Sequence, residues 1–139
     1  MLSLATGSHR GVAPFLIEDL TPRAERIPQE FTHANGVTGI GTLTIAVHEL
    51  SHARRWYETA LGTAATAFAD DMVGARGIYF TVGPHKVEFV TPADPQSPLN
   101  GWLRAYGPSP YGATLTTAAP GPQLLDLALT HGANLSFGA

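Results

Sequence analysis

One stretch, residues 42–62, constrains the fold most, because it can be parsed in two ways that imply different chemistry. It reads TLTIAVHELSHARRWYETALG. The first parse is a strand over Thr42–Val47, a turn, and a helix over Ser51–Leu61 that ends at Gly62. The second is one helix through residues 48–52, HELSH, which matches the H-E-x-x-H pattern of zinc hydrolases.

The alternation of side chains favours the strand. Apolar Leu43, Ile45 and Val47 alternate with residues that are polar or small, which is the period of a strand with one buried face. The β-branched residues in this run are stiff at χ1 and favour a strand over a helix. Ser51 is then predicted to be the N-cap of the following helix, and Gly62 its C-terminal stop.

The helical parse gives a zinc site in which His48 and His52 hold the metal and Glu49 is the general base. It requires a helix that runs through His48, so that residues i and i+4 share one face. The alternation before His48 and the lack of an evident third ligand count against it. The competing interpretation is two surface histidines, one at a turn and one at a helix start.

Composition indicates a single folded domain over residues 1–139 and excludes several function classes. The chain is 44% hydrophobic, which is enough for a core, and its net charge of −3 with no basic run gives no reason to expect nucleic acid. No apolar run approaches the roughly 20 residues that cross a bilayer, so no membrane span is expected. The chain has no cysteine and shows no export signal at its start, and we expect a cytoplasmic protein.

Short elements separated by glycine and proline are predicted along the rest of the chain. Strands are expected at Pro14–Leu20, Ala64–Asp71, Gly77–Val82, Lys86–Thr91, Ala113–Ala118 and Leu135–Phe137. Helices are expected at Leu99–Tyr106 and Leu124–Thr130, the second stopped by Gly132, and residues 23–41 are expected to form a long connection.

A Gly83-Pro84-His85 turn is predicted to pair two of these strands. If Val82 and His85 flank the turn, Tyr79 lies opposite Glu88, and opposed residues share a face. The other face of the hairpin is apolar and is expected to pack under the first helix; it comprises Ile78, Phe80, Val87 and Phe89. Glu88 on an enclosed sheet face is a candidate acid, base or ligand anchor, with Tyr79 as its neighbour. The competing interpretation places both residues at a solvent-exposed edge of the sheet or at a dimer interface.

An internal repeat supports this order of elements. The segment at residues 17–22, IEDLTP, resembles residues 87–92, VEFVTP, and the TLT of residues 42–44 recurs at residues 114–116. The predicted unit is one strand, one helix and three strands, and one copy is whole, from about residue 41 to residue 92. The second copy is expected to be split, with its start in residues 111–139 and its final strand in residues 9–22.

With these features the chain resembles the vicinal oxygen chelate superfamily, the glyoxalase and bleomycin-resistance fold. The resembling residues are the strand with its VHEL turn, the helix end at Trp56-Tyr57 and Leu61-Gly62, and the hairpin GPHKVEF. The segment at residues 97–107 is similar to the linker of epimerase-like members. The resemblance implies an α+β fold, in which βαβββ modules form a curved mixed sheet with a cup and helices on the outer face.

Metal-dependent relatives hold a divalent ion in that cup, with His or Glu on first strands and Glu on fourth strands. Glu88 stands at the fourth-strand position and Glu18 at its repeat, whereas the first-strand position falls on Thr42 and its repeat on Ala113 or Thr114. No imidazole stands at either first-strand position, and one or two carboxylates rarely suffice for a hard cation. No cofactor is therefore expected, and a divalent metal is the alternative, with His48, His52 and Glu88 as its candidate ligands.

The function expected from these features is small-molecule binding, or metal-independent catalysis on an unidentified substrate, in the cup of a homodimer. Glu88 is the candidate catalytic residue, and the candidate ligand-binding residues are Thr42, Thr44, Tyr79, Glu88, Glu18 and Tyr111. The alternatives are a metal-dependent lyase, isomerase or dioxygenase of the same superfamily, a zinc hydrolase through HELSH, and a non-catalytic dimerisation module. Whether the chain is an enzyme stays open at this point.

Overall fold

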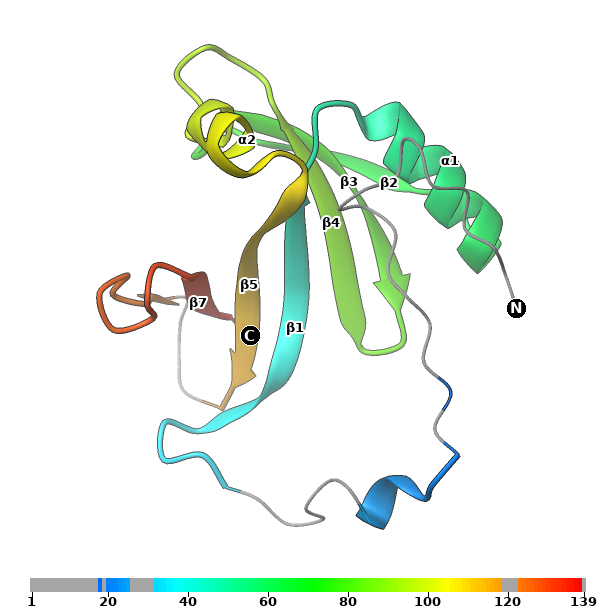
Figure 1. Cartoon of the computed structure of the whole chain (residues 1–139), viewed down its shortest axis with the longest axis vertical. Coiled ribbons are helices and arrows are strands. Elements are labelled where there is room, and N and C mark those ends of the chain that lie inside the picture. The colour runs from blue at the N-terminus through cyan, green and yellow to red at the C-terminus, as the bar shows by residue number, and fades with distance from the viewer. Residues whose placement is uncertain (1–17, 19, 26–31, 119–122, 139) are drawn as a thin grey trace.

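The computed structural model describes residues 18, 20–25, 32–118 and 123–138, and it consists of one mixed sheet and two α-helices (Figure 1). The seven strands lie in the order β2-β3-β4-β1-β5-β7-β6. Their bounds are β1 Val37–Ala46, β2 Thr66–Asp70, β3 Ala75–Val82, β4 His85–Pro92, β5 Ser109–Thr117, β6 Gln123–Leu124 and β7 Asn134–Gly138. The helices are α1 Leu50–Leu61 and α2 Leu99–Tyr106, and one 3-10 turn, η1, spans Arg23–Glu25. The α+β glyoxalase-like architecture expected from the sequence is confirmed.

Strand β1 lies at the middle of the sheet and joins its two halves. It pairs in parallel with β4, where Thr44 lies beside Glu88, and antiparallel with β5, where Thr42 lies beside Thr114. The strand begins at Val37, five residues earlier than predicted, after a turn at Gly36 with φ +72°. The first residues of β1 pair with the end of β5, where Val37 lies beside Thr117, a partner so distant in sequence that a local pattern does not reveal it.

Helix α1 follows β1 after a short turn, as the strand parse predicts, but its N-terminus differs from the prediction. The N-cap is Glu49, in an extended conformation and without a side-chain cap, so the prediction of Ser51 as the N-cap is wrong. Ser51 is the second helical residue and is exposed. The C-terminus is as predicted: Gly62 has φ +67° and donates its N–H to Glu58 O at 3.0 Å, and left-handed φ favours glycine.

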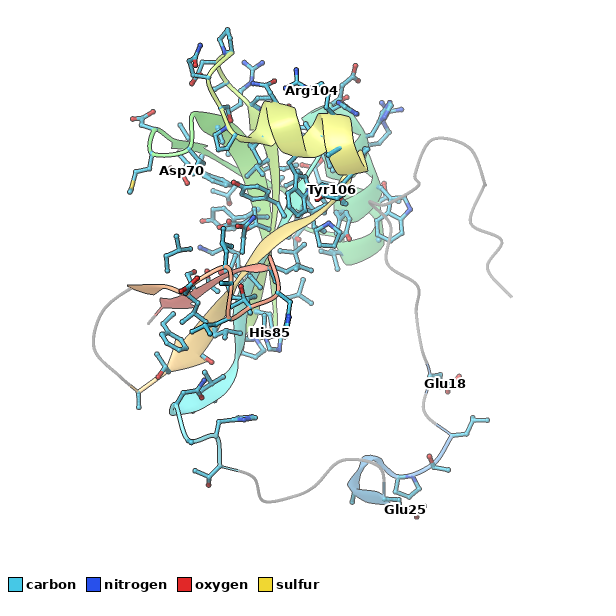
Figure 2. All side chains as sticks on the ribbon, turned by 60° about the vertical axis from the view of Figure 1, so that its left-hand side comes forward. Glu18, Glu25, Asp70, His85, Arg104 and Tyr106 are labelled. Atoms are coloured by element: carbon cyan, nitrogen blue, oxygen red, sulfur yellow. The ribbon has the colours of Figure 1, made fainter. Side chains whose placement is uncertain are left out.

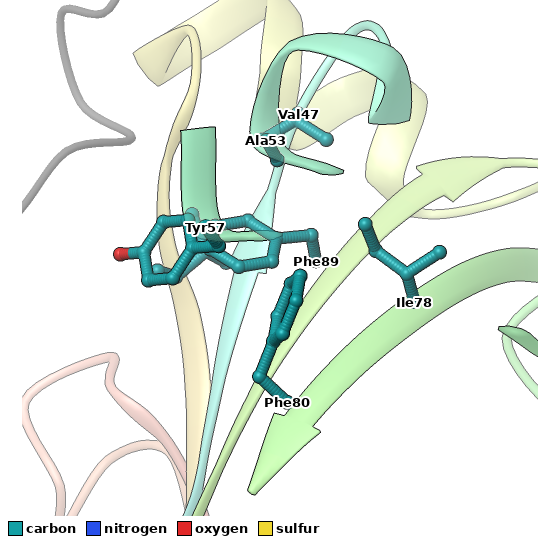
Figure 3. Close-up of a cluster of buried hydrophobic side chains, with 7 residues drawn as sticks. Val47, Ala53, Tyr57, Ile78, Phe80 and Phe89 are labelled. Atoms are coloured by element: carbon teal, nitrogen blue, oxygen red, sulfur yellow. The ribbon is translucent and has the colours of Figure 1, made fainter. Parts of the chain in front are cut away.

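The main core lies between α1 and the sheet. Its centre is a set of aromatic rings, with the Tyr57 ring centroid 4.6 Å from that of Phe89 and 5.5 Å from that of Phe80 (Figure 3). Ile78 and Ala53 complete the contact and are almost fully buried. The helix therefore buries its Ala53 and Tyr57 stripe against the apolar face of the β3–β4 hairpin, as the sequence predicts.

The register of the β3–β4 hairpin is the one predicted. Val82 pairs with His85, and Tyr79 pairs with Glu88. Gly83 has φ +59° in the turn, where a Cβ would be strained. His85 also ties the hairpin to β1, because its Nδ1 lies 2.7 Å from Ile40 O and donates a hydrogen bond to that carbonyl.

Helix α2 packs on the opposite face of the sheet, so only α1 lies on the outer face. Leu99 and Leu103 are buried against a second cluster formed by Ala46, Ala75 and Val90. These three residues belong to the face that also carries Thr44 and Glu88, which we call the cup face. Figure 1 shows the two helices on different sides of the sheet at one end. Helix α2 thus covers one end of the cup face.

The C-terminal part contains no helix, and the prediction of one over Leu124–Thr130 is wrong. Leu124 pairs with Ser136 in the short strand β6, and residues 127–132 form turns that end at Gly132, with φ +84°. Asp126 holds these turns, because its Oδ1 accepts from Ala128 N at 2.8 Å. β7 then runs parallel to β5.

The strand predicted over Pro14–Leu20 is not formed where the structure describes that segment. Glu18 and Leu20 lie outside any strand, and residues 14–17 and 19 lie outside the described residues. β7 occupies the place beside β5 that β4 occupies beside β1, since both pairs are parallel.

Candidate ligand site on the cup face

A pocket of about 170 Å³ opens on the cup face, between the sheet and one edge of α2. Ligand cavities are usually about 300–1,000 Å³, so this one suits a small molecule or one end of a larger one. Its floor comes from β1, β4, β5 and β7. The lining residues that the argument uses are Thr44, Asp70, Glu88, Tyr111, Thr114 and Ser136.

Glu88 is the carboxylate of the pocket floor. Thr44, its neighbour on the parallel strand β1, donates its hydroxyl to Glu88 Oε2 at 3.2 Å. Lys86 Nζ lies 3.7 Å from Glu88 Oε1, and 19% of the Glu88 side chain is exposed. A half-enclosed carboxylate with one hydroxyl donor keeps free lone pairs toward the pocket.

A second pair of hydroxyls repeats this arrangement on the other half of the sheet. Thr114 Oγ1 and Ser136 Oγ lie 3.3 Å apart across the parallel strands β5 and β7. Thr44–Glu88 and Thr114–Ser136 therefore occupy matching places in the two parallel strand pairs, and both line the pocket. The second pair carries no charge.

Asp70 and Tyr111 form the side wall. Asp70 Oδ1 accepts from Met72 N at 3.0 Å and from Val73 N at 3.4 Å, which fixes the turn after β2. Burial raises the pKa of Tyr111, and the negative charge of Asp70 adds to that effect. Trp102 holds the ring edge-on at 5.3 Å. The Tyr111 hydroxyl therefore stays protonated near neutral pH and can donate a hydrogen bond.

The remaining sequence-predicted residues lie around the pocket or away from it. Tyr79 lies opposite Glu88 on β3, with Lys86 Nζ 4.8 Å from the centroid of its ring, and Thr42 lies beside Lys86 on β1. Neither belongs to the pocket lining. Glu18 lies well away from the sheet (Figure 2), so the structure does not bring it to Glu88.

The HELSH segment does not form the helix that a zinc hydrolase needs. Helix α1 begins at Leu50, and the residue before it, Glu49, is extended, so His48 precedes the helix while His52 lies within it. Both histidines are exposed. The geometric premise of that interpretation, residues i and i+4 on one helix face, is not met.

A divalent metal is a poor match to the donors around the pocket. Among the described residues, no group of three or more His, Cys, Asp or Glu side chains is close enough to hold an ion. The two matching strand pairs supply one carboxylate and three neutral hydroxyls, Thr44, Thr114 and Ser136. Divalent ions in proteins prefer several charged oxygen or imidazole ligands, so these residues do not fit the metal implied by the resemblance.

Sequence reasoning missed Asp70 and Ser136. The pocket that these two residues line forms only when α2 packs on the sheet and β7 pairs with β5. The sequence held one signal for Ser136. The tripeptide LSF of residues 135–137 resembles VEF of residues 87–89, and Ser136 lies beside a threonine of β5 as Glu88 lies beside a threonine of β1. Nothing local marks Asp70.

Comparison with solved structures gives clear matches at low sequence identity. Methylmalonyl-CoA epimerase from Mycobacterium tuberculosis matches with a TM-score of 0.66 and 18% identity, over 77% of this chain and 91% of that one. A variant methylmalonyl-CoA epimerase from Streptomyces coelicolor, in complex with 2-nitronate-propionyl-CoA, matches with a TM-score of 0.63 and 16% identity, over 73% and 93%. A hypothetical protein from Bacillus halodurans matches with a TM-score of 0.61 and 15% identity, over 70% and 91%.

Comparison by sequence adds no relative. No protein-family model matches the chain, and no curated protein matches it either. Within the described residues, no helix is long and apolar enough to cross a membrane.

Proposed function

We propose that this chain, which has the vicinal oxygen chelate (glyoxalase-like) fold, binds a small organic molecule in the cup-face pocket with Glu88 as its main polar contact. The observation that carries the proposal is the position of Glu88. Its carboxylate is mostly enclosed and accepts a hydrogen bond from the Thr44 hydroxyl. It lies on a pocket floor that also carries the Thr114 and Ser136 hydroxyls. Enclosed carboxylates with partly filled hydrogen-bonding capacity are features of ligand and proton-transfer sites.

Catalysis is a further step of the same proposal. Among Thr44, Glu88, Thr114 and Ser136, only Glu88 carries a carboxyl group. A carboxylate within hydrogen-bond reach of a bound molecule can act as general base, and its protonated form as general acid. The hydroxyls of Thr44 and Thr114 would orient the ligand and need no metal to do so.

The test is a ligand screen by chemical-shift changes in the protein's amide spectrum. A ligand that binds the wild-type pocket is expected to bind Glu88→Gln at least about tenfold more weakly, since a charged hydrogen-bond acceptor is lost. Glu49→Gln is the matched control, because Glu49 is exposed and its side chain caps nothing. Equal binding to wild type and Glu88→Gln, with shifts confined to another surface, contradicts the proposal.

The second candidate is a metal-dependent isomerase of the same superfamily, and the comparisons support it better than they support a metal-free binding protein. Two of the three structures described above are methylmalonyl-CoA epimerases. Epimerisation removes and returns a proton next to a carbonyl group, a task within the reach of a carboxylate such as Glu88. The donor set around Glu88 speaks against the metal part of this candidate.

Two measurements separate the candidates. An isomerase of this kind exchanges the proton next to the carbonyl of methylmalonyl-CoA for deuterium in D2O, and Glu88→Gln stops the exchange. Elemental analysis of untagged protein then decides the role of a metal. About one metal per chain that Glu88→Gln loses supports the metal-dependent isomerase, whereas exchange without bound metal supports the metal-free enzyme.

We also propose a homodimer. The sheet has two edges among its described strands, β2 and the two-residue β6, and exposed edges favour pairing with another chain. Light scattering at micromolar concentration tests this proposal, and a monomer mass would contradict it.

A further inference from the structure

The charges around the cup-face pocket have one predominant sign. We infer that the pocket selects a small amine, as its ammonium ion, over a carboxylate of the same shape. This inference rests on the proposed binding function and adds the chemical class of the ligand.

The lining carries two acids and, among the described residues that line it, no base. Asp70 stands on the side wall and Glu88 on the floor, and no Lys, Arg or His lies in the lining. Lys86 lies outside the lining and approaches Glu88 at 3.7 Å. With Lys86 counted, the two acids and the one base leave a net negative charge, so the pocket attracts a cation and repels an anion.

Hydrogen-bonding capacity points the same way. Thr44 occupies one site on Glu88 Oε2, and the turn amides occupy Oδ1 of Asp70. The two oxygens of a carboxylate together offer about four acceptor sites, so Glu88 and Asp70 both retain free acceptor sites. An ammonium group brings three donors and no acceptor, and the Thr114 and Ser136 hydroxyls can accept as readily as donate.

The other end of the pocket is apolar. It runs beneath α2 and is lined by Phe68, Val73, Val90 and Leu99. Burying a methylene there stabilises the complex. The Tyr111 side chain also lines the pocket, and cations are attracted to aromatic rings. The ligand class is therefore an amine with a short apolar body, small enough for about 170 Å³.

The experiment compares three probes of nearly equal shape: isobutylamine, isobutyramide and isobutyrate. Amide chemical shifts are followed by titration at pH 7 and low salt. Isobutylamine is expected to bind at least about tenfold more tightly than isobutyrate, and isobutyramide should bind with an affinity between the two. Added salt should reduce the difference in affinity between the amine and the carboxylate, because it screens their charges.

Variants assign the selectivity to the two acids. Glu88→Gln and Asp70→Asn should each weaken amine binding about three- to tenfold, and the double variant should remove the preference for the amine. Asn at position 70 keeps the Oδ1 acceptor for the turn, so folding should persist. Asp71→Asn is the matched control, because Asp71 is exposed and outside the lining.

The outcomes distinguish this inference from the function on which it rests. If isobutyrate binds as tightly as isobutylamine, or the double variant keeps the preference, the charge selectivity is overturned. The binding function survives that result if isobutyramide still depends on Glu88. If all three probes leave the amide spectrum of the pocket unchanged at tens of millimolar, both are overturned.

Discussion

The two halves of the sheet have the same strand pairing but very different packing. In the first half, β1–β4, helix α1 covers the outer face, and the buried aromatic cluster lies beneath it. In the second half, β5–β7, no residue between 109 and 138 that the structure describes is buried; those of β5 and β7 are half-buried, except the exposed Pro110. The pocket lies where the halves meet. Glu88 and Thr44 stand on the well-packed side and Thr114 and Ser136 on the weakly packed side, so we expect one rigid wall and one adaptable wall.

The largest expected difference between the halves is the response to truncation of a phenylalanine. Phe89→Ala removes a ring that is fully buried, and we expect a loss of about 3–5 kcal/mol in the free energy of unfolding. Phe137→Ala removes a half-buried ring of β7 and should cost about 1 kcal/mol. Urea unfolding of both variants checks this. Equal losses would show that the second half is packed as firmly as the first.

The alkaline limit of stability should be set by the first half. Burial raises the pKa of Tyr57 from 10.0 to about 12, so the folded state favours the neutral phenol. Below pH 10 this contribution is fully present, and it is lost as pH rises from 10 through 12, because the unfolded chain releases the proton first. This rise in the pKa of Tyr57 corresponds to about 3 kcal/mol in the free energy of unfolding.

Unfolding measured from pH 9 to 12 tests the Tyr57 contribution. Tyr57→Phe should flatten the decline over that range, whereas Tyr106→Phe, at an exposed tyrosine of α2, should not. An unchanged slope in Tyr57→Phe would assign the alkaline transition to another group.

A smaller effect should follow from crowding the second half. A Cβ at Gly112 would lie 2.9 Å from the backbone oxygen of Asn134 on β7, a contact that backbone must relieve by moving. We expect Gly112→Ala to cost about 1–3 kcal/mol and to displace β7, with ligand binding in the pocket reduced. Amide hydrogen exchange along β5 and β7, beside that of β3, measures the displacement. Exchange that accelerates equally in β3 would mean that the halves do not respond separately.

The smallest effect is expected in α2, the helix between the halves. Gly101 lies within it, and a Cβ there meets nothing within 4 Å. Gly101→Ala should therefore raise the free energy of unfolding by about 0.5–1 kcal/mol, because alanine loses less conformational freedom in a helix. A thermal scan checks the sign. Destabilisation would indicate that α2 sits more tightly on its neighbours than the structure shows.

Local signals in the sequence predicted the first half well. The Gly83-Pro84 turn fixed the hairpin register, which placed Tyr79 opposite Glu88, and the side-chain alternation of β1 placed Thr44 on the face that also bears Glu88. These are short-range patterns, and each is reinforced by burial of the opposite face under α1.

In the second half, local signals predicted strands where β5 and β7 form, but they were wrong about the segment between these strands. The leucines of residues 124–129 suggested a helix, but Leu124 and Leu129 are exposed, and the turn around Asp126 competes successfully with helix formation. Asp70 lines the pocket from the end of β2 and Ser136 lines it from β7, whose residues pair with β5 across 22 positions of the sequence. No periodicity records such contacts.

The central position of β1 has a consequence for how the chain folds. β1 is synthesised before both of its neighbours, β4 and β5, which begin at His85 and Ser109. Until those segments leave the ribosome, β1 has neither partner, so its backbone and its apolar side chains stay unpaired while dozens of further residues are added. Contacts of such long sequence separation slow folding. The centre of the sheet can therefore close only after β5 has been synthesised, and an unpaired β1 is the segment of the nascent chain that chaperones would need to shield.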